Sequence, residues 1–161
     1  MFENSHTQEK IITELVDTIE QLQPHSLIYC AGEIVPALEA LREHDCEVYR
    51  VEHFDELESL PRTELGVVFD YLEHLPEEEA LQLLCRMRNL KCERLWVAVR
   101  TCPQWSFNTM IGIGFNRNNC YEDGERQVCT YSYDLATYNR KREWNNSRFW
   151  ANPQNWGKYR W

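Results

Sequence analysis

At 161 residues the chain is long enough for one domain with a real core, because a chain of about 150 residues buries roughly 70% of its unfolded surface. Its 43% apolar and 27% charged residues exclude a disordered or fibrous class, and no run approaches the roughly 20 apolar residues of a membrane span. The net charge of −9 argues against nucleic-acid binding, and the polar first ten residues lack a secretory signal, which predicts a cytoplasmic protein.

The first predicted element is a helix. Ser5 and Gln8 have the spacing of a capping box, and Pro24 ends the helical pattern. The apolar residues between them fall on one face: Ile11, Ile12, Leu15, Val16, Ile19 and Leu22. Residues 26–31 then form an almost wholly apolar run, which is typical of a strand that helices cover on both faces.

Helices and strands alternate through the middle of the chain. A helix is predicted at residues 33–43, with Pro36 tolerated in its first turn, and strands are predicted at residues 47–51 and 65–71. The next helix begins after Pro76, because the acids at 77–79 suit the positive end of a helix dipole.

The last predicted elements are a strand at residues 94–99, a helix at 103–112, and strands at 115–121 and 126–134. Strands that alternate with helices imply crossover units and a parallel sheet. We therefore predict an α/β fold: a three-layer, Rossmann-like, mainly parallel sheet of about six strands, with an N-terminal helix and an aromatic C-terminal tail. Residues 1–134 form the domain, and residues 135–161 form a tail that packs on it.

The tail differs from the body in charge. Residues 135–161 hold six basic residues and one acid, a net charge of +5, whereas residues 1–134 carry 11 basic and 25 acidic residues, a net charge of −14. Four tryptophans recur at intervals that fit neither an amphipathic helix nor a strand: Trp144, Trp150, Trp156 and Trp161. We favour docking of the tail on the acidic body. The alternatives are contact with a protein partner and stacking on nucleic-acid bases.

Cysteine and histidine spacing predicts no metal site. The seven cysteines contain no Cys-x-x-Cys pair, and the five histidines lack metal-ligand spacing. Cys30 and Cys85 lie among apolar neighbours, where a reduced thiol behaves as a small hydrophobe. Buried, reduced cysteines are therefore favoured over a disulfide scaffold.

Ligands of open α/β sheets bind beyond the carboxyl ends of the strands, which here are residues 30–33, 51–54 and 70–74. The stretch LIYCAGEIVPALEALREHDCEVYRVE has a lone glycine, Gly32, and an acid 20 residues later, Glu52. A tight turn followed by such an acid is typical of nucleotide sites, although any strand-helix-strand unit of this size also gives the spacing.

Over about residues 26–134 the chain resembles a class I S-adenosylmethionine-dependent methyltransferase. The stretch quoted above resembles that family's first strand, turn, helix and acidic strand end, and LGVVFDYLEHLPEEEALQLLCRMRNL resembles its fourth strand and following helix. The resemblance implies cofactor contacts at Gly32, Glu52 and Asp70, with Glu52 bonded to the ribose. It also implies that Asp70 and His74 lie on the rim of the substrate opening.

Two departures from the family pattern predict weakened or lost cofactor binding. Side chains replace the family's usual glycines around Gly32, and Glu33 adds a negative charge there. Only 13 residues separate Glu52 from Gly66, where the family inserts a helix, a third strand and an adenine-binding acid. No cofactor is therefore expected, or S-adenosylmethionine if the protein is active.

The candidate catalytic residues are Asp70 and His74. A histidine at a strand end can act as a general base, but we favour a helix-start histidine that is satisfied by local backbone.

We accordingly predict a methyltransferase-like binding or regulatory module that is not an enzyme. The alternatives are a minimal methyltransferase whose tail rebuilds the adenine wall, and nucleic-acid binding through the tail. The closing block RFWANPQNWGKYRW also resembles that of a small bacterial family of unassigned function.

Overall fold

A computed structural model describes residues 5–138, 154 and 158. In these residues six strands form one sheet in the order β2-β1-β3-β4-β6-β5. The strands are β1 (Ser26–Ala31), β2 (Glu47–Val51), β3 (Thr63–Phe69), β4 (Cys92–Arg100), β5 (Asn116–Asp123) and β6 (Arg126–Asp134). Strands β1 to β4 are parallel, and β6 runs antiparallel between β4 and β5. The predicted α/β fold with a mainly parallel sheet is thus confirmed.

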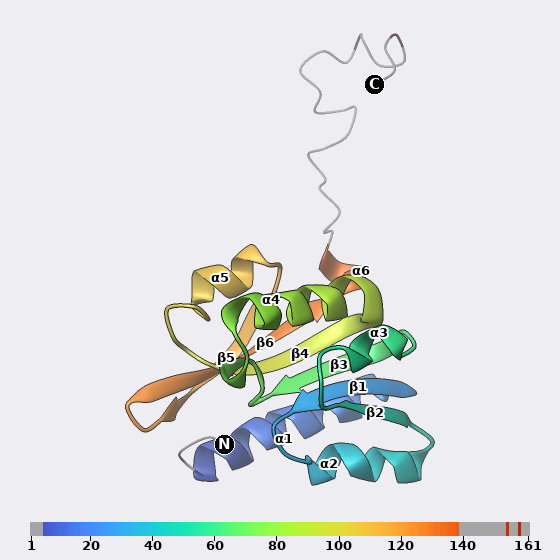
Figure 1. The fold of residues 1–161 in the computed structure, drawn as a ribbon, viewed down its shortest axis with the longest axis horizontal. Coiled ribbons are helices and arrows are strands. Elements are labelled where there is room, and N and C mark those ends of the chain that lie inside the picture. The colour runs from blue at the N-terminus through green and yellow to red at the C-terminus, as the bar shows by residue number, and fades with distance from the viewer. Residues whose placement is uncertain (1–4, 139–153, 155–157, 159–161) are drawn as a thin grey trace.

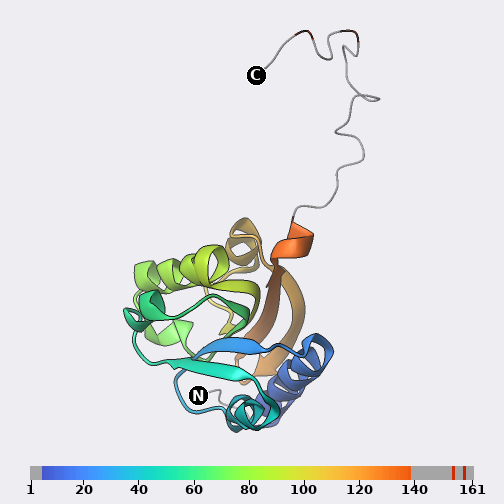
Figure 2. The same ribbon diagram turned by 90° about the vertical axis from the view of Figure 1, so that its right-hand side faces the viewer.

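Helices cover the two faces of the sheet and make three layers (Figures 1 and 2). Helices α1 (Ser5–Leu22) and α2 (Pro36–Glu39) lie on one face. Helices α3 (Glu56–Ser59), α4 (Glu77–Arg86) and α5 (Phe107–Gly112) lie on the other. The helix α6 (Leu135–Tyr138) follows β6. Three short helical turns complete the described elements: η1 (Ala40–His44), η2 (Leu72–His74) and η3 (Met87–Lys91). No helix in this part of the chain is both long and apolar enough to span a bilayer.

The sheet separates two apolar clusters, because successive side chains of a strand point to opposite faces. On β4, Trp96 and Ala98 pack beneath α1, whereas Val97 and Val99 pack with α4 and α5. The residues of β1 from Leu27 to Ala31 are all buried, as expected of a strand covered on both faces.

The predicted helix at residues 33–43 is instead two short pieces, α2 and η1. Helix α2 begins at Pro36, whose ring presets the helical φ of a first turn, so Glu33 and Ile34 stay outside it. Asp45 ends η1 in a left-handed conformation with φ of 58°. The predicted helix at residues 103–112 is shortened in the same way to α5, because Ser106 caps its first turn through the backbone N–H of Thr109.

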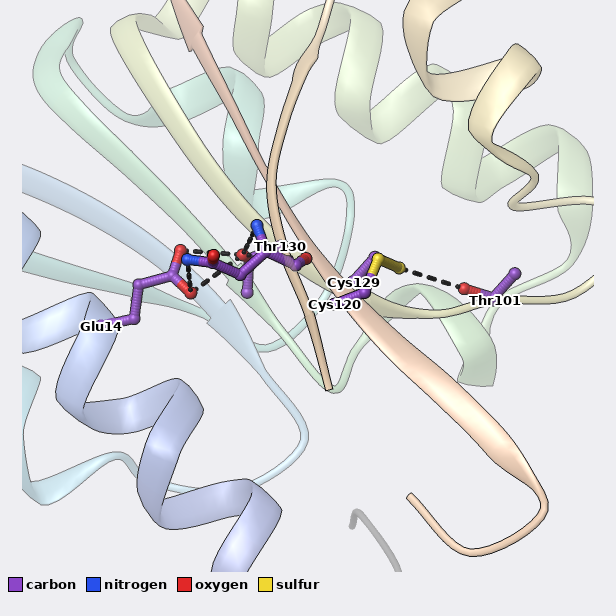
Figure 3. The surroundings of a disulfide bond; sticks show 6 residues. Glu14, Thr101, Cys120, Cys129 and Thr130 are labelled. Carbon is purple, nitrogen blue, oxygen red and sulfur yellow. Dashed lines mark hydrogen bonds between the residues drawn. A yellow bond between two sulfur atoms is a disulfide. The ribbon is translucent and has the colours of Figure 1, made fainter. Parts of the chain in front are cut away.

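Helix α1 is joined to the β5–β6 hairpin by a part-buried group of hydrogen bonds around Glu14 (Figure 3). The carboxylate of Glu14 accepts hydrogen bonds from the hydroxyls of Thr130 at 2.8 Å and Tyr121 at 2.7 Å. The amide of Asn119 donates to the same carboxylate at 3.1 Å. These bonds hold the N-terminal helix against the antiparallel end of the sheet.

One pair of cysteines departs from the expectation of reduced thiols. Cys120 and Cys129 face each other in the β5–β6 register and form a disulfide, with Cα atoms 4.1 Å apart (Figure 3). The hairpin turn brings together two residues nine apart in sequence, which no local sequence motif announces. Cys30 is a buried free thiol, as predicted, and Cys85 is a half-buried one.

Candidate functional site

Strand register brings three predicted site residues to one edge of the sheet. Cys30 pairs with Val51, and Ala31 pairs with Phe69. Gly32, Glu52 and Asp70 therefore each follow the carboxyl end of one of three neighbouring strands. This carboxyl edge is the place where open α/β sheets bind their ligands.

Gly32 is required by the packing of two strand ends. A Cβ atom at this position would lie 3.2 Å from the backbone carbonyl oxygen of Asp70, which is tighter than ordinary van der Waals contact. The φ of Gly32 is not in the left-handed region, so a strained turn is not its reason here. Asp70 itself has a φ of 47°, a conformation that aspartate tolerates better than most residues.

The polar groups at the end of β2 bond to one another. The carboxylate of Glu52 lies 3.0 Å from Nη1 of Arg50, and the Glu52 carbonyl accepts a hydrogen bond from the Tyr71 hydroxyl at 3.0 Å. The carboxylate of Glu56 accepts the backbone N–H groups of Glu52 and His53, at 3.0 and 3.3 Å. These N–H groups also hold the pKa of Glu56 below its ordinary value. The predicted ribose acid is therefore exposed but paired with Arg50, and its backbone is held by Glu56 and Tyr71.

Asp70 and His74 lie together, as the sequence suggested. Nε2 of His74 is 3.7 Å from Oδ1 of Asp70, one helical turn away across η2. The His74 side chain is 59% exposed, whereas Asp70 is buried. The pair offers an accessible imidazole beside a carboxylate, an arrangement that can bind a partner or move a proton.

A second charged group, formed by residues of η2 and of the ends of β4 and β5, was not predicted from the sequence. Oε1 of Glu73 accepts the backbone N–H of Arg100 at 2.6 Å, and Arg100 Nη2 lies 3.2 Å from Oδ2 of the fully buried Asp123. The other oxygen of Glu73 is buried without a hydrogen-bond partner in the described part of the chain. Burial raises the pKa of Glu73. The only signal in the sequence is that charged residues, Arg100 and Asp123, end two of the strands.

A small hollow lies beside Asp70 and the turn that follows Gly32. This hollow of about 60 Å³ is lined by Gln8 and Ile12 of α1, by residues 33–36, and by Phe69 and Asp70. Pockets that enclose drug-sized ligands usually measure roughly 300–1,000 Å³. Helix α1 and the turn after β1 thus form most of the walls of this hollow.

Two further predictions concern metal binding and the C-terminal tail. No group of three or more histidine, cysteine or acidic side chains in the described part of the chain is placed to hold a metal ion. The four tail tryptophans, Trp144, Trp150, Trp156 and Trp161, lie outside the described residues, so the predicted packing of the tail stays a prediction.

The chain matches a known family in sequence and resembles known proteins in fold. The model of a family of unknown function, DUF6231, matches residues 6–161, whereas no curated protein matches the sequence. The fold is similar to magnesium protoporphyrin IX methyltransferase from Synechocystis PCC 6803 with bound S-adenosylmethionine. The TM-score is 0.58 at 11% identity, over 78% of each chain. For the same enzyme with bound SAH the TM-score is 0.54 at 11% identity, over 80% of this chain and 84% of that chain. At such low identity the likeness shows a methyltransferase-like fold and nothing finer.

Proposed function

This chain belongs to the DUF6231 family, and we propose that it is a binding module on a methyltransferase-like fold. In this proposal the carboxyl edge of the sheet, around Asp70 and His74, contacts the partner, and S-adenosylmethionine is not held. The observation that carries the proposal is the hollow of about 60 Å³ beside Asp70 and the turn that follows Gly32.

That hollow does not fit the cofactor. A volume of this size holds a few water molecules, since one water needs about 10–15 Å³ by this measure, and a nucleoside with an amino-acid arm is far larger. The walls are side chains of α1 and of residues 33–36, which are anchored by the buried Val35. Opening the hollow would therefore require α1 or the turn after β1 to move.

The residues at this edge also suit the cofactor poorly. The carboxylate of Glu52 is paired with Arg50, so a ribose would have to compete with an existing ion pair. Strand β2 is the edge of the sheet, and the single turn of α3 is the only helix between β2 and β3. The wall that class I methyltransferases place against adenine has no counterpart between Glu52 and Thr63 in this chain.

The exposed part of the edge indicates the kind of partner. Glu33, Glu52 and the acids at the start of α4 are exposed, and His74 stands among them. A negatively charged surface attracts cationic groups and repels polyanions, so we expect a basic or hydrogen-bond-donating surface on the partner.

A minimal S-adenosylmethionine-dependent methyltransferase is the second candidate. It is favoured by the TM-scores of 0.58 and 0.54 to cofactor-bound structures of one methyltransferase. This candidate requires Glu52 to release Arg50 and bond a ribose, and it requires the tail to supply an adenine wall.

Thermal unfolding of the full-length protein with and without S-adenosylmethionine separates the two candidates. A ligand at 100 times its Kd stabilises the native state by about 2.7 kcal/mol, which corresponds to roughly 5–10 °C in Tm for a protein of this size. We expect S-adenosylmethionine at millimolar concentration to change the Tm by less than about 1 °C, because almost no ligand is bound.

The Glu52→Ala variant is the matched control for this measurement. If the chain is a binding module, wild type and variant show the same small response to the ligand. A large shift in wild type that Glu52→Ala removes would reject the proposal and establish a cofactor site at the end of β2.

A further inference from the structure

A groove of about 330 Å³ opens at the opposite edge of the sheet, where β4 begins and β6 ends. One wall is the last part of α1, including Gln21 and Leu22, and the other is formed by Ser132 and Asp134 of β6. Trp96 of β4 is among the lining residues but is only 1% exposed. The groove therefore joins polar side chains of α1 and β6 beside a buried tryptophan.

Trp96 has an unmet requirement for a hydrogen-bond acceptor. Its side chain is only 1% exposed, and its indole N–H is buried without an acceptor in the described part of the chain. Buried N–H groups are nearly always partnered, and one left unpaired costs about 1–3 kcal/mol. Because this N–H has almost no exposed surface, an acceptor from a docked segment reaches it only if the groove side chains move.

The walls are acidic where the groove meets α1. Glu14 lines this groove and also a second hollow of about 440 Å³ between α1 and β5, which Glu9 and Asp17 border with a single lysine, Lys10. At the other wall Asp134 is paired with Arg94 at 3.2 Å. The combined surface carries more acids than bases, so it favours a basic occupant.

The chain itself supplies such an occupant. Residues 139–161 follow α6, which begins directly after the groove residue Asp134 and packs through Tyr138 against Tyr133 on the α4–α5 face. They must therefore pass around the β4–β6 end of the sheet to reach the groove on the α1 face. These 23 residues can extend about 75 Å, so reach is no limit. They carry a net charge of +5 and four tryptophans, whose rings gain most from burial. The family match runs through them to residue 161, so they belong to the same unit.

We propose that residues 139–161 of the same chain dock in this groove, with basic side chains toward Glu14 and Asp17. The tail then covers the amino ends of β3 and β4. It stays away from the carboxyl edge, so it neither plugs nor completes the site beside Gly32 and Glu52.

Site-specific photo-crosslinking of the full-length protein tests this placement. A benzophenone amino acid replaces Gln21, which is exposed at the groove, and a matched variant carries it at Gln82, which is exposed on α4 across the sheet. Peptide mapping after irradiation is expected to join residue 21 to a peptide from residues 139–161, with no such product from residue 82. Mixing light and isotope-labelled chains identifies whether the product forms within one chain.

Each other outcome contradicts the proposal. Products that join only light to heavy chains would place the tail on a second copy, and equal products from both probes, or none from residue 21, would exclude the groove.

A second readout is limited trypsin digestion after Arg140, Lys141 and Arg142. The added positive charge of Gln21→Arg repels a docked basic tail. We therefore expect trypsin to cleave after residues 140–142 about threefold to fivefold faster in this variant than in Gln82→Arg. Equal rates would contradict docking.

Discussion

The backbone carbonyl oxygen of Asp70 lies 3.2 Å from the point that a Cβ atom on Gly32 would occupy. The ends of β1 and β3 therefore meet so closely that a side chain at position 32 would push on the Asp70 carbonyl. This contact gives the lone glycine of the turn a structural reason, independent of any ligand.

Replacement of this glycine tests that relationship. We expect Gly32→Ala to lower the free energy of unfolding by about 1 kcal/mol, because the Asp70 carbonyl must shift by a few tenths of an ångström. Gly112→Ala is the control, since a Cβ there has no neighbour within 4 Å and alanine favours the helix. Urea denaturation measures both. Equal stability of the two variants would contradict the close contact.

The carboxylate of Glu14 joins α1 to the hairpin, so its removal should loosen the N-terminal helix. We expect Glu14→Ala to cost about 2 kcal/mol, because hydroxyl donors from Thr130 and Tyr121 lose a charged acceptor. Glu20→Ala, at an exposed position of the same helix, should change stability by less than about 0.5 kcal/mol. Thermal or urea unfolding compares the pair, and a similar small effect of both would show that the contact is weak in solution.

The disulfide gives a chemical prediction. Alkylation of the denatured, unreduced protein should label five cysteines, and prior reduction should raise this to all seven. Closing a loop of nine residues is worth about 2–3 kcal/mol in the chain-entropy model. Reductant should therefore lower the stability of wild type but leave a Cys120→Ala/Cys129→Ala variant unchanged. Seven labels without reduction would refute the pairing.

The buried carboxyl of Glu73 should make the stability of the fold depend on pH. Burial raises its pKa in the folded state, and nearby Asp70 adds to this, while the Arg100 N–H opposes it. A carboxyl with a raised folded pKa contributes stability below its unfolded pKa of about 4.3, and that contribution is lost as pH rises through the folded pKa. Glu73→Gln should therefore lose less stability than wild type between about pH 4 and pH 7. Parallel pH profiles from urea midpoints would contradict a strained, buried carboxyl.

Sequence alone predicts the parts of the fold that repeat simple patterns. Strands β1 and β2 match the predicted bounds because apolar runs and alternation are local signals. The helix at residues 33–43 was too long in the prediction, because Pro36 starts a helix but does not extend one backward. Gly32, Glu52 and Asp70 were brought together by register, which follows from the parallel order of strands.

Contacts between distant segments could not be predicted. The disulfide depends on which residues face each other in an antiparallel ladder, and the Glu73–Arg100 bond depends on the spacing of two strand ends. The pairing of Glu52 with Arg50 was also invisible, because alternation places residues two apart on the same face without saying whether they bond.

We propose that this methyltransferase-like fold does not hold S-adenosylmethionine. Isothermal titration of the full-length protein tests it most directly, because binding of the cofactor would have to open a hollow of about 60 Å³ and release Glu52 from Arg50. We predict no saturable heat up to millimolar ligand. A stoichiometric isotherm with micromolar or tighter Kd, abolished by Glu52→Ala, would contradict the account.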